Sequence, residues 1–216
     1  VKIMTGAPIP NGADSILQVE LTSTEDNKVK LQQESMKHFI RRKGENLSKG
    51  EIALSTGTYL TPSRVGLCAT MGYSSIPVIK KLKVAIIATG DELKQPGEEI
   101  ERGEIYESNS FGLSGLIKWL GHESTRLNCI GDTIDDLRQT LNQASLDHDL
   151  ILTSGGVSMG EWDLVRKIME EEGDIHFWRV KLRPGSPPLF GTWNNTPIFG
   201  LPGNPVSSHV VFRILV

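Results

Sequence analysis

Residues Leu150–Asp163 read Leu-Ile-Leu-Thr-Ser-Gly-Gly-Val-Ser-Met-Gly-Glu-Trp-Asp, a short apolar run followed by paired glycines, hydroxyl side chains and a carboxylate. The run Leu150–Leu152 is typical of a strand buried on both faces, and Ser154, Gly155 and Gly156 end it. Adjacent glycines allow a positive φ and a close approach of the backbone, so that several N–H groups can converge on an anion. The stretch therefore predicts a phosphate-binding loop after a central strand.

A helix is expected directly after this loop. Residues 163–172 have helical spacing, with Leu164, Ile168 and Met169 apolar, which would place a helix N-terminus beside the same anion. Asp163 would either cap that helix or carry a divalent metal that bridges to the phosphate. Composition alone favours the cap, whereas the double glycine with its flanking serines favours the phosphate loop.

Length and composition limit the class of protein. The 216 residues suit one large domain, or a medium domain with a smaller companion, and 38% hydrophobic residues suffice for real cores. A net charge of −3 and a pI near 6.0 argue against a nucleic-acid or membrane surface. No apolar run reaches the roughly 20 residues of a membrane span, so we expect a cytoplasmic protein. Cys68 and Cys129 lie in apolar patterns and are expected to be buried thiols in a reducing compartment.

The first part of the chain is expected to be β-rich. Short strand-like runs occur at Ser15–Glu20 and Lys28–Leu31 and are separated by turn residues. Thr61 and Pro62 then begin a predicted helix, which Gly72 ends. We therefore expect a small β-rich domain over residues 1–50 and a helical linker over residues 51–80. The absence of an initiator Met and the apolar helical pattern at residues 206–216 suggest a fragment.

Strands and helices alternate over residues 81–216. The predicted order is a strand at 84–89, a helix at 111–120, a strand at 125–130, a helix at 133–144 and the strand at 150–153. This alternation predicts an α/β domain with a doubly wound, mostly parallel sheet. A strand at 176–182 and a hairpin of 189–192 with 196–199, turned by Asn194 and Asn195, would extend the sheet.

Charged and glycine-rich loops follow the predicted strands, where ligands collect in open α/β sheets. Glu92, Asp132 and Asp163 fall in three of these loops. At about 4 Å, two like charges repel by about 4 kcal/mol at an effective dielectric constant of about 20, so convergent carboxylates need a cation, for which Mg²⁺ is the natural candidate. A further loop, Gly200–Ser207, has two glycines and two prolines immediately before a helix; it could present N–H groups to a ligand or be a plain turn.

Cations follow in the same half of the chain. Arg179 and Lys181 alternate along the predicted strand and should share a face, and Arg183 precedes the stiff Pro184–Gly185 turn, where its guanidinium could hold an oxyanion in a bidentate fork. Other chemistry has little support. The five histidines are scattered without metal-ligand spacing, and the sequence has no GxSxG, Walker lysine or GxGxxG motif.

Several motifs together resemble one family. They are Thr-Gly-Asp-Glu-Leu at 89–93, Ser-Asn-Ser at 108–110, the opening stretch, Arg-Pro-Gly-Ser-Pro at 183–187 and Gly-Leu-Pro-Gly-Asn-Pro-Val-Ser at 200–207, with Thr-Gly-Ala-Pro-Ile-Pro at 5–10 and Arg-Arg-Lys-Gly-Glu at 41–45 upstream. This set resembles the MoeA family of molybdopterin molybdenumtransferases, which is related to the gephyrin E domain. The resemblance covers essentially the whole chain.

The resemblance implies a MogA-like α/β domain and part of a smaller β-rich domain, in a fragment lacking an N-terminal part and a C-terminal β domain. It implies an elongated homodimer that inserts molybdenum from molybdate into adenylylated molybdopterin and releases AMP with the help of Mg²⁺. It also implies the molybdopterin adenylyltransferase as a possible partner. Neither a nucleic acid nor a membrane is an expected partner.

By the same resemblance, Glu92, Asp132 and Asp163 are catalytic and Asp163 holds the metal. The residues assigned to substrate binding are Thr5, Asn109, Ser154, Gly155, Gly156, Ser158, Arg179, Arg183, Pro184, Gly185, Pro202, Gly203, Asn204, Pro205 and Ser207.

Two positions depart from the family pattern. Asn46 stands where the family commonly has Asp, and Ser186 stands where it usually has the second Lys of Lys-Pro-Gly-Lys-Pro. A binding or scaffold protein without catalysis is therefore the alternative from outside the enzymes. The preceding adenylyltransferase step is the alternative enzyme, although single-domain relatives of that kind lack an upstream β-rich unit.

Overall fold

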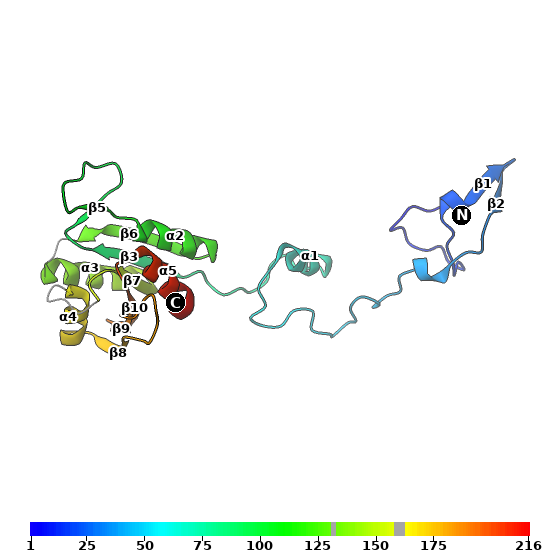
Figure 1. The fold of residues 1–216 in the computed structure, drawn as a ribbon. Coiled ribbons are helices and arrows are strands. Elements are labelled where there is room, and N and C mark those ends of the chain that lie inside the picture. The colour runs from blue at the N-terminus through cyan, green and yellow to red at the C-terminus, as the bar shows by residue number, and fades with distance from the viewer. Residues whose placement is uncertain (131–132, 158–162) are drawn as a thin grey trace. The chain divides into compact units, whose positions relative to one another are not determined.

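The structure is a computed structural model that describes residues 1–130, 133–157 and 163–216, without the side chains of residues 128–130. The chain divides into two compact units, Val1–Ile76 and Pro77–Val216 (Figure 1). The predicted segments 1–50 and 51–80 thus fall in the first unit except for the last four residues. No helix in the described ranges is long and apolar enough to span a membrane.

The first unit contains a short β-hairpin. β1 (Thr22–Glu25) pairs antiparallel with β2 (Lys28–Leu31), and the turn residues Asp26 and Asn27 have φ of 47° and 60°. The prediction of β2 is confirmed. The predicted strand Ser15–Glu20 is wrong, because Ile16 makes only an isolated bridge to Met36 and the chain then turns into the 3-10 helix η1 (Val19–Leu21). A second 3-10 helix, η2, spans Lys37–Phe39.

The helix predicted after Thr61 is confirmed as α1 (Pro62–Thr70). The hydroxyl of Thr61 accepts a hydrogen bond from the N–H of Arg64 at 3.4 Å, and Gly72, with φ of 87°, follows the last turn. Proline at the first helical position has its φ already set and has no N–H that would remain unpaired there. Cys68 on this helix is buried as expected, whereas the side chain of Cys129 lies outside the described residues.

The second unit is built on a six-stranded sheet (Figure 1). Its strands lie in the order β6 (Glu123–Ile130), β3 (Lys83–Thr89), β7 (Leu150–Ser154), β10 (Thr196–Leu201), β9 (Leu189–Trp193) and β8 (Asp174–Trp178). The first four are parallel, and β9 runs antiparallel to both of its neighbours. The predicted, mostly parallel sheet is confirmed.

The hairpin of β9 and β10 is also confirmed. Its turn residues Asn194 and Asn195 have φ of 47° and 64°, the left-handed conformation that a tight hairpin turn requires. By contrast, the predicted strand at 176–182 is too long. β8 ends at Trp178 because Arg179 adopts a φ of 68°, and the chain then folds back so that the N–H of Val180 bonds to Ser186 O. Arg179 and Lys181 therefore do not alternate along a strand.

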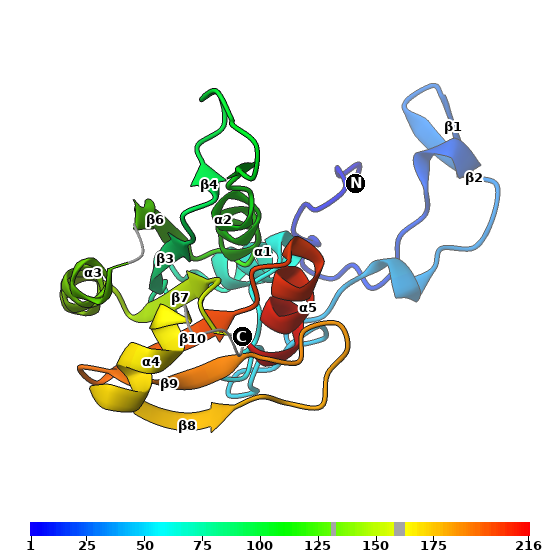
Figure 2. The same cartoon turned by 60° about the vertical axis from the view of Figure 1, so that its left-hand side comes forward.

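Helices cover both faces of the sheet (Figure 2). α2 (Asn109–Trp119) and α5 (Pro205–Leu215) lie on one face, and α3 (Ile134–Asp147) and α4 (Leu164–Glu171) lie on the other. β3 faces both layers, since Ala85 and Ile87 pack on the α3 and α4 side while Val84 and Ile86 pack on the α2 and α5 side. The predicted doubly wound architecture is confirmed.

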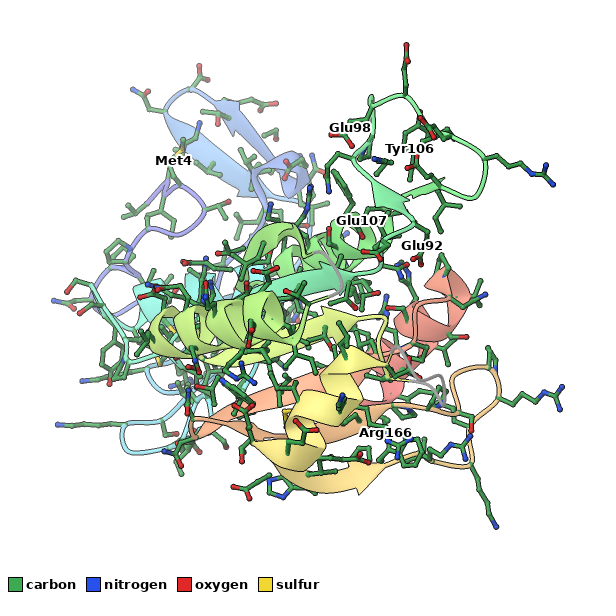
Figure 3. The ribbon with its side chains drawn as sticks, turned by 90° about the vertical axis from the view of Figure 1, so that its left-hand side faces the viewer. Met4, Glu92, Glu98, Tyr106, Glu107 and Arg166 are labelled. Carbon is green, nitrogen blue, oxygen red and sulfur yellow. The ribbon has the colours of Figure 1, made fainter. Side chains whose placement is uncertain are left out.

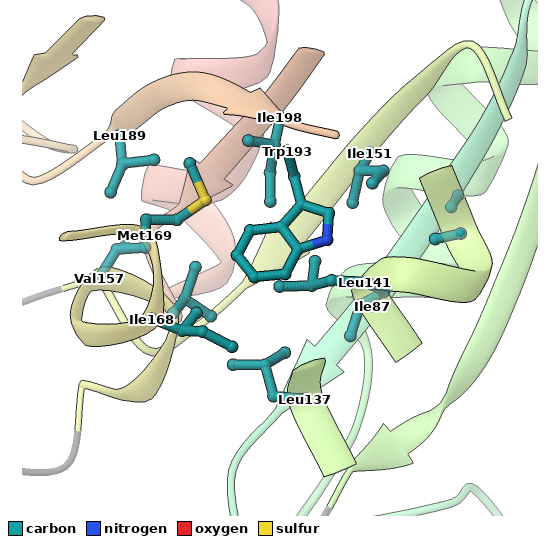
Figure 4. Close-up of a cluster of buried hydrophobic side chains, with 13 residues drawn as sticks. Ile87, Leu137, Leu141, Ile151, Val157, Ile168, Met169, Leu189, Trp193 and Ile198 are labelled. Carbon is teal, nitrogen blue, oxygen red and sulfur yellow. The ribbon is translucent and has the colours of Figure 1, made fainter. Parts of the chain in front are cut away.

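Trp193 anchors the core on the α3 and α4 face. Its indole is 4% exposed and packs among aliphatic side chains such as Leu141, Ile151 and Ile198 (Figure 4). Its Nε1 donates to Asn142 Oδ1 at 2.9 Å, which satisfies its polar atom. This core packs against β7 and β10 and so fixes the position at which the loops after these two strands begin.

Candidate functional site

Three strands bring their carboxyl ends together. Ala88 of β3 and Leu201 of β10 are both in register with Ser154, the last residue of β7. The loops that begin after Thr89, Ser154 and Leu201 therefore start side by side at the edge of the sheet where ligands collect in α/β folds.

The paired glycines fit a tightly packed backbone. Gly155 and Gly156 have φ of 95° and 67°. A Cβ at Gly155 would lie 2.6 Å from Thr89 O, and one at Gly156 would lie 3.0 Å from Val165 Cγ2. A side chain at Gly155 would thus push the loop away from β3, and one at Gly156 would push it away from α4, so the glycines allow the β7 loop to lie directly against both.

This loop also uses part of its own hydrogen-bonding capacity. The N–H of Gly155 donates to Leu201 O at 3.0 Å, and Gly156 O accepts from the N–H of Arg166 at 3.1 Å. The expected convergence of N–H groups on an anion therefore excludes the Gly155 N–H, which joins β7 to β10. Ser158 lies outside the described residues.

Asn109 connects two of the three loops. It is the first residue of α2, and its Nδ2 lies 2.7 Å from both Ser154 Oγ and Gly203 O. A carbonyl oxygen can only accept, so the contact with Gly203 fixes which end of the amide is the donor. Asn109 Oδ1 is buried and has no hydrogen-bond partner among the described atoms. We call Asn109, Ser154 and Gly203 the amide bracket.

The loop before α5 is rigid for a related reason. Asn204 caps the helix, and its Oδ1 accepts from the N–H groups of Val206 and Ser207 at 3.1 and 3.2 Å. Pro202 is buried, and Pro205 begins the helix. The N–H groups of Val206 and Ser207 are therefore already hydrogen-bonded to Asn204. A ligand of this loop would have to bind its other polar groups.

Glu92 follows β3 at the same edge. Its carboxylate folds back over Gly90, where an added Cβ would lie 2.7 Å from Oε2. Its backbone oxygen accepts from the N–H of Ile105 at 2.8 Å, which pairs β4 (Leu93–Lys94) with β5 (Ile105–Tyr106). Figure 3 shows Glu92 and Glu107 at the base of this excursion, with Glu98 and Tyr106 further out.

Of the other two predicted carboxylates, the structure describes only one. Asp132 lies outside the described residues. Asp163 occupies the position before α4, and its side chain makes no capping hydrogen bond to the described residues of that helix. Asp163 thus lies at the helix N-terminus where the sequence placed it.

A hollow of about 420 Å³ adjoins the turn after β8 and is lined by Lys181, Leu182, Arg183, Gly185 and Ser186. It brings together two of the three expected cations. The third, Arg179, lies over the ring of Trp178, with its Cζ 5.0 Å from the ring centroid. Gly185 has a φ of 110°, and an added Cβ there would lie 2.6 Å from Val211 Cγ2, so this turn packs directly on α5. Pro184 joins Arg183 through a cis peptide bond.

Trp178 links the cation-bearing turn to the β7 loop. Its Nε1 donates to Val157 O at 3.1 Å, and the guanidinium carbon of Arg166 lies 3.8 Å above its ring. Such a cation over an indole face is favourable by about 0.5–1 kcal/mol at exposed sites. Sequence reasoning missed both residues, although an aromatic directly before two alternating cations was visible.

Thr5 lies in the first unit, in an exposed turn closed by the N–H of Ala7 on Met4 O at 3.0 Å. In the same unit Arg41 Nη1 donates to Asn46 Oδ1 at 3.0 Å, so the residue that departs from the family pattern has a defined partner.

Sequence reasoning also missed Glu107. The residue is 2% exposed, and its carboxylate accepts from the N–H of Ser110 at 2.7 Å and from the Ser110 hydroxyl at 2.5 Å. A carboxylate just before a helix can accept from N–H groups of its first turn, but nothing in the sequence indicated that this one is buried.

Comparisons with known proteins agree along the chain. Residues 85–216 match the family model described as probable molybdopterin binding domain, and residues 1–72 match the MoeA N-terminal region, domains I and II. The molybdopterin molybdenumtransferase of Haemophilus influenzae is 38% identical over 218 residues, which is 100% of this chain and 54% of that protein. The protein of the same name from Bacillus subtilis is 37% identical over 222 residues, 100% of this chain and 52% of its own length.

Solved structures show the same pattern. The molybdopterin biosynthesis MoeA protein from Pyrococcus horikoshii OT3 is similar with a TM-score of 0.72 and 29% identity, over 99% of this chain and 52% of that one. A molybdenum cofactor biosynthesis protein from Pyrococcus furiosus has a TM-score of 0.59 and 28% identity, over 79% of this chain and 50% of that one. The chain spans about half the length of the curated relatives it matches.

Proposed function

The chain belongs to the MoeA family, and from this membership we propose that it acts in molybdenum cofactor biosynthesis as a molybdopterin molybdenumtransferase. In the proposed reaction, molybdenum from molybdate enters the dithiolene of adenylylated molybdopterin and AMP is released, with Mg²⁺ as cofactor. Molybdate and the adenylylated pterin are substrates.

The observation that carries the proposal is the amide bracket. It lies where β3, β7 and β10 end together, and it presents two polar groups whose capacity is not used up. Ser154 Oγ accepts from Asn109, so its own hydrogen is available to a ligand, and the buried Asn109 Oδ1 needs a donor. An acceptor beside a donor suits the edge of a nucleobase or a pterin, and a buried acceptor left unpaired is unfavourable.

We propose that Asp163 and the phosphates of the nucleotide bind Mg²⁺ together. Mg²⁺ commonly binds through one or two carboxylates and completes its shell with phosphate oxygens and water. The described residues contain no cluster of three His, Cys, Asp or Glu side chains that could enclose a metal alone. Asp163 would supply one carboxylate and the nucleotide phosphates the other oxygens. The bound ion would offset phosphate charge, while the chain's own residues hold the base and the ribose.

The hollow lined by Lys181 and Arg183 supports a place for an oxyanion. A guanidinium can bind two oxygens of phosphate or molybdate through parallel N–H groups, whereas an ammonium acts as a point charge. Two such side chains beside one rigid turn suit a doubly charged anion. Arg183 is accordingly proposed to orient the anion and Lys181 to add charge.

Assembly and location are part of the same proposal. We propose a cytoplasmic homodimer in which Thr5 and the loop at residues 41–45 of one subunit approach the active site of the other. The adenylyltransferase that forms the substrate would be the natural partner for its transfer. The competing proposal of a binder without catalysis is favoured by one observation, since Asn46 accepts from Arg41 where a carboxylate is usual in the family.

The direct test is AMP release. Purified protein is incubated with adenylylated molybdopterin, molybdate and Mg²⁺, and AMP is quantified by chromatography. We expect release that depends on molybdate and is lost in Ser154→Ala. Tight binding of the substrate without release would instead support the binder.

A further inference from the structure

Glu107 carries a buried carboxylate to which the proposed function assigns no role. It is 2% exposed and immediately precedes the residue that caps α2. Moving a carboxylate out of water is costly unless hydrogen bonds or an opposite charge replace its hydration. Such a group therefore needs a structural or functional reason to be there.

In the part of the chain that the structure describes, the Glu107 side chain makes hydrogen bonds only with Ser110. Oε1 accepts from the Ser110 N–H at 2.7 Å and Oε2 from its hydroxyl at 2.5 Å. Ser108, the residue in the capping position, makes no capping hydrogen bond with its side chain. Glu107, and not Ser108, therefore accepts a hydrogen bond from a backbone N–H of the first turn of α2.

A cation completes the chain of hydrogen bonds. Arg126 of β6 donates from Nε to Ser110 Oγ at 3.0 Å, and its guanidinium carbon lies 3.3 Å from the centroid of the Phe111 ring. The Ser110 hydroxyl thus donates to Glu107 and accepts from Arg126. This charge-assisted arrangement offsets the burial of Glu107 and joins α2 to β6.

The first turn of α2 is the part of the helix that holds the bracket. Asn109 lies directly between the capping Ser108 and Ser110, and its Nδ2 reaches Ser154 Oγ and Gly203 O at 2.7 Å. Two hydrogen bonds of this length require the Asn109 backbone to be placed within a few tenths of an ångström. Glu107 holds Ser110 through both its backbone N–H and its hydroxyl. The position of the adjacent residue Asn109 is therefore fixed as well.

We propose that Glu107 is a positioning residue for the ligand cleft, which acts through Ser110 to place Asn109 so that the amide bracket joins the β7 loop to the β10 loop. Its carboxylate does not touch the ligand. The predicted effect on ligand binding rests on the proposed function. The predicted effect on how well the two loops are ordered does not.

The test combines ligand binding with a double-mutant cycle. AMP in the presence of Mg²⁺ is the probe, measured by calorimetry on the whole chain. Glu107→Gln retains size but offers Ser110 one charged acceptor fewer, and we expect AMP binding to weaken about tenfold. Asn109→Ala weakens it as well. In the Asn109→Ala background, Glu107→Gln should change affinity by less than about twofold, because its effect passes through Asn109.

The matched control is Glu99→Gln, which removes one exposed charge from the same excursion between β3 and α2 and should leave affinity unchanged. Ser110→Ala provides a second variant that keeps Glu107 and its bond to the backbone, and it should show the same coupling to Asn109. Multiplicative effects of Glu107→Gln and Asn109→Ala, which a general loss of stability would produce, would overturn the proposal.

A second readout needs no ligand. Amide hydrogen exchange of the free protein should speed up at Gly155, whose N–H bonds to Leu201 O, in Glu107→Gln and in Asn109→Ala. Exchange in the middle of β7 should stay as in the parent chain. If the parent chain fails to bind AMP, the proposed function is wrong, while unchanged exchange at Gly155 in Glu107→Gln would refute the positioning role separately.

Discussion

Asn109 Nδ2 lies 2.7 Å from Ser154 Oγ, which joins the first turn of α2 to the end of the central strand β7. The two residues are 45 positions apart in the sequence. The same nitrogen lies 2.7 Å from Gly203 O, so one side chain connects three parts of the chain. Loops joined in this way are already positioned relative to one another in the free protein, and such preorganisation would lower the entropy lost on binding a ligand.

Gly155→Ala should destabilise the fold more than a glycine replacement with the same backbone conformation. Gly97 is the matched control, since its φ of 97° is close to the 95° of Gly155 and nothing lies within 4 Å of an added Cβ. Gly97→Ala should cost about 1–2 kcal/mol for the left-handed backbone. Gly155→Ala should cost a further 1–3 kcal/mol, approximately, because its Cβ meets Thr89 O. Urea denaturation measures both, and equal costs would contradict the close packing of β7 on β3.

Leu141→Ala should reveal the contribution of the core around Trp193. Leu141 is fully buried, and its truncation should lower the free energy of unfolding by about 2–5 kcal/mol. Leu146 on the same helix is 79% exposed, and Leu146→Ala should change it by less than about 0.5 kcal/mol. Similar losses in the two variants, measured by thermal unfolding, would mean that α3 does not present this face to the sheet.

Stability should depend on pH through the contact of Arg138 with Glu172. Arg138 Nη2 lies 2.6 Å from Glu172 Oε1, and this hydrogen bond holds the pKa of Glu172 below its ordinary value of about 4.3. A carboxyl with a lowered folded-state pKa contributes stability above its unfolded pKa and loses it as the pH falls through the folded one. Arg138→Met should therefore be less stable than the parent chain at pH 7, and the difference should shrink below about pH 4.

Salt supplies the control for this prediction, because screening weakens exposed ion pairs. The stability difference between Arg138→Met and the parent chain should decrease at 1 M NaCl. A difference that is independent of both pH and salt would show that the variant acts through packing.

The two departures from the family pattern offer a test of catalysis against mere binding. Asn46→Asp would place a carboxylate beside Arg41, and Ser186→Lys would add a cation to the hollow of Lys181 and Arg183. If the chain is a working transferase, AMP release should already be measurable without either change. A large gain from near zero would favour a degenerate binder.

The sequence predicted most of the second unit because its elements are marked locally. The apolar strand at Val84–Ala88, the helix at 133–144 and the Asn194–Asn195 turn each carry their own signal, and all three are observed, the helix as α3 (Ile134–Asp147). The β8 boundary was wrong because Arg179 has a positive φ that its residue type does not indicate. Ser15–Glu20 was wrong because apolar residues without a partner strand do not form a ladder.

The candidate site was predictable in its location but not in its bonds. Glycines at strand ends indicated the loops, yet the capture of the Gly155 N–H by Leu201 O depends on the adjacency of β7 and β10. The same holds for Asn109, whose two partners lie far along the chain. Glu107 was overlooked because a carboxylate before a helix is ordinarily exposed, and only the fold buries it.

A crystal structure of the chain soaked with AMP and Mg²⁺ would test the proposed site directly. We expect density for AMP beside Gly155 and Gly156, with a hydrogen-bond donor of the ligand on Asn109 Oδ1 and a metal ion on Asp163. AMP bound elsewhere, with the amide bracket still unpartnered, would contradict this expectation.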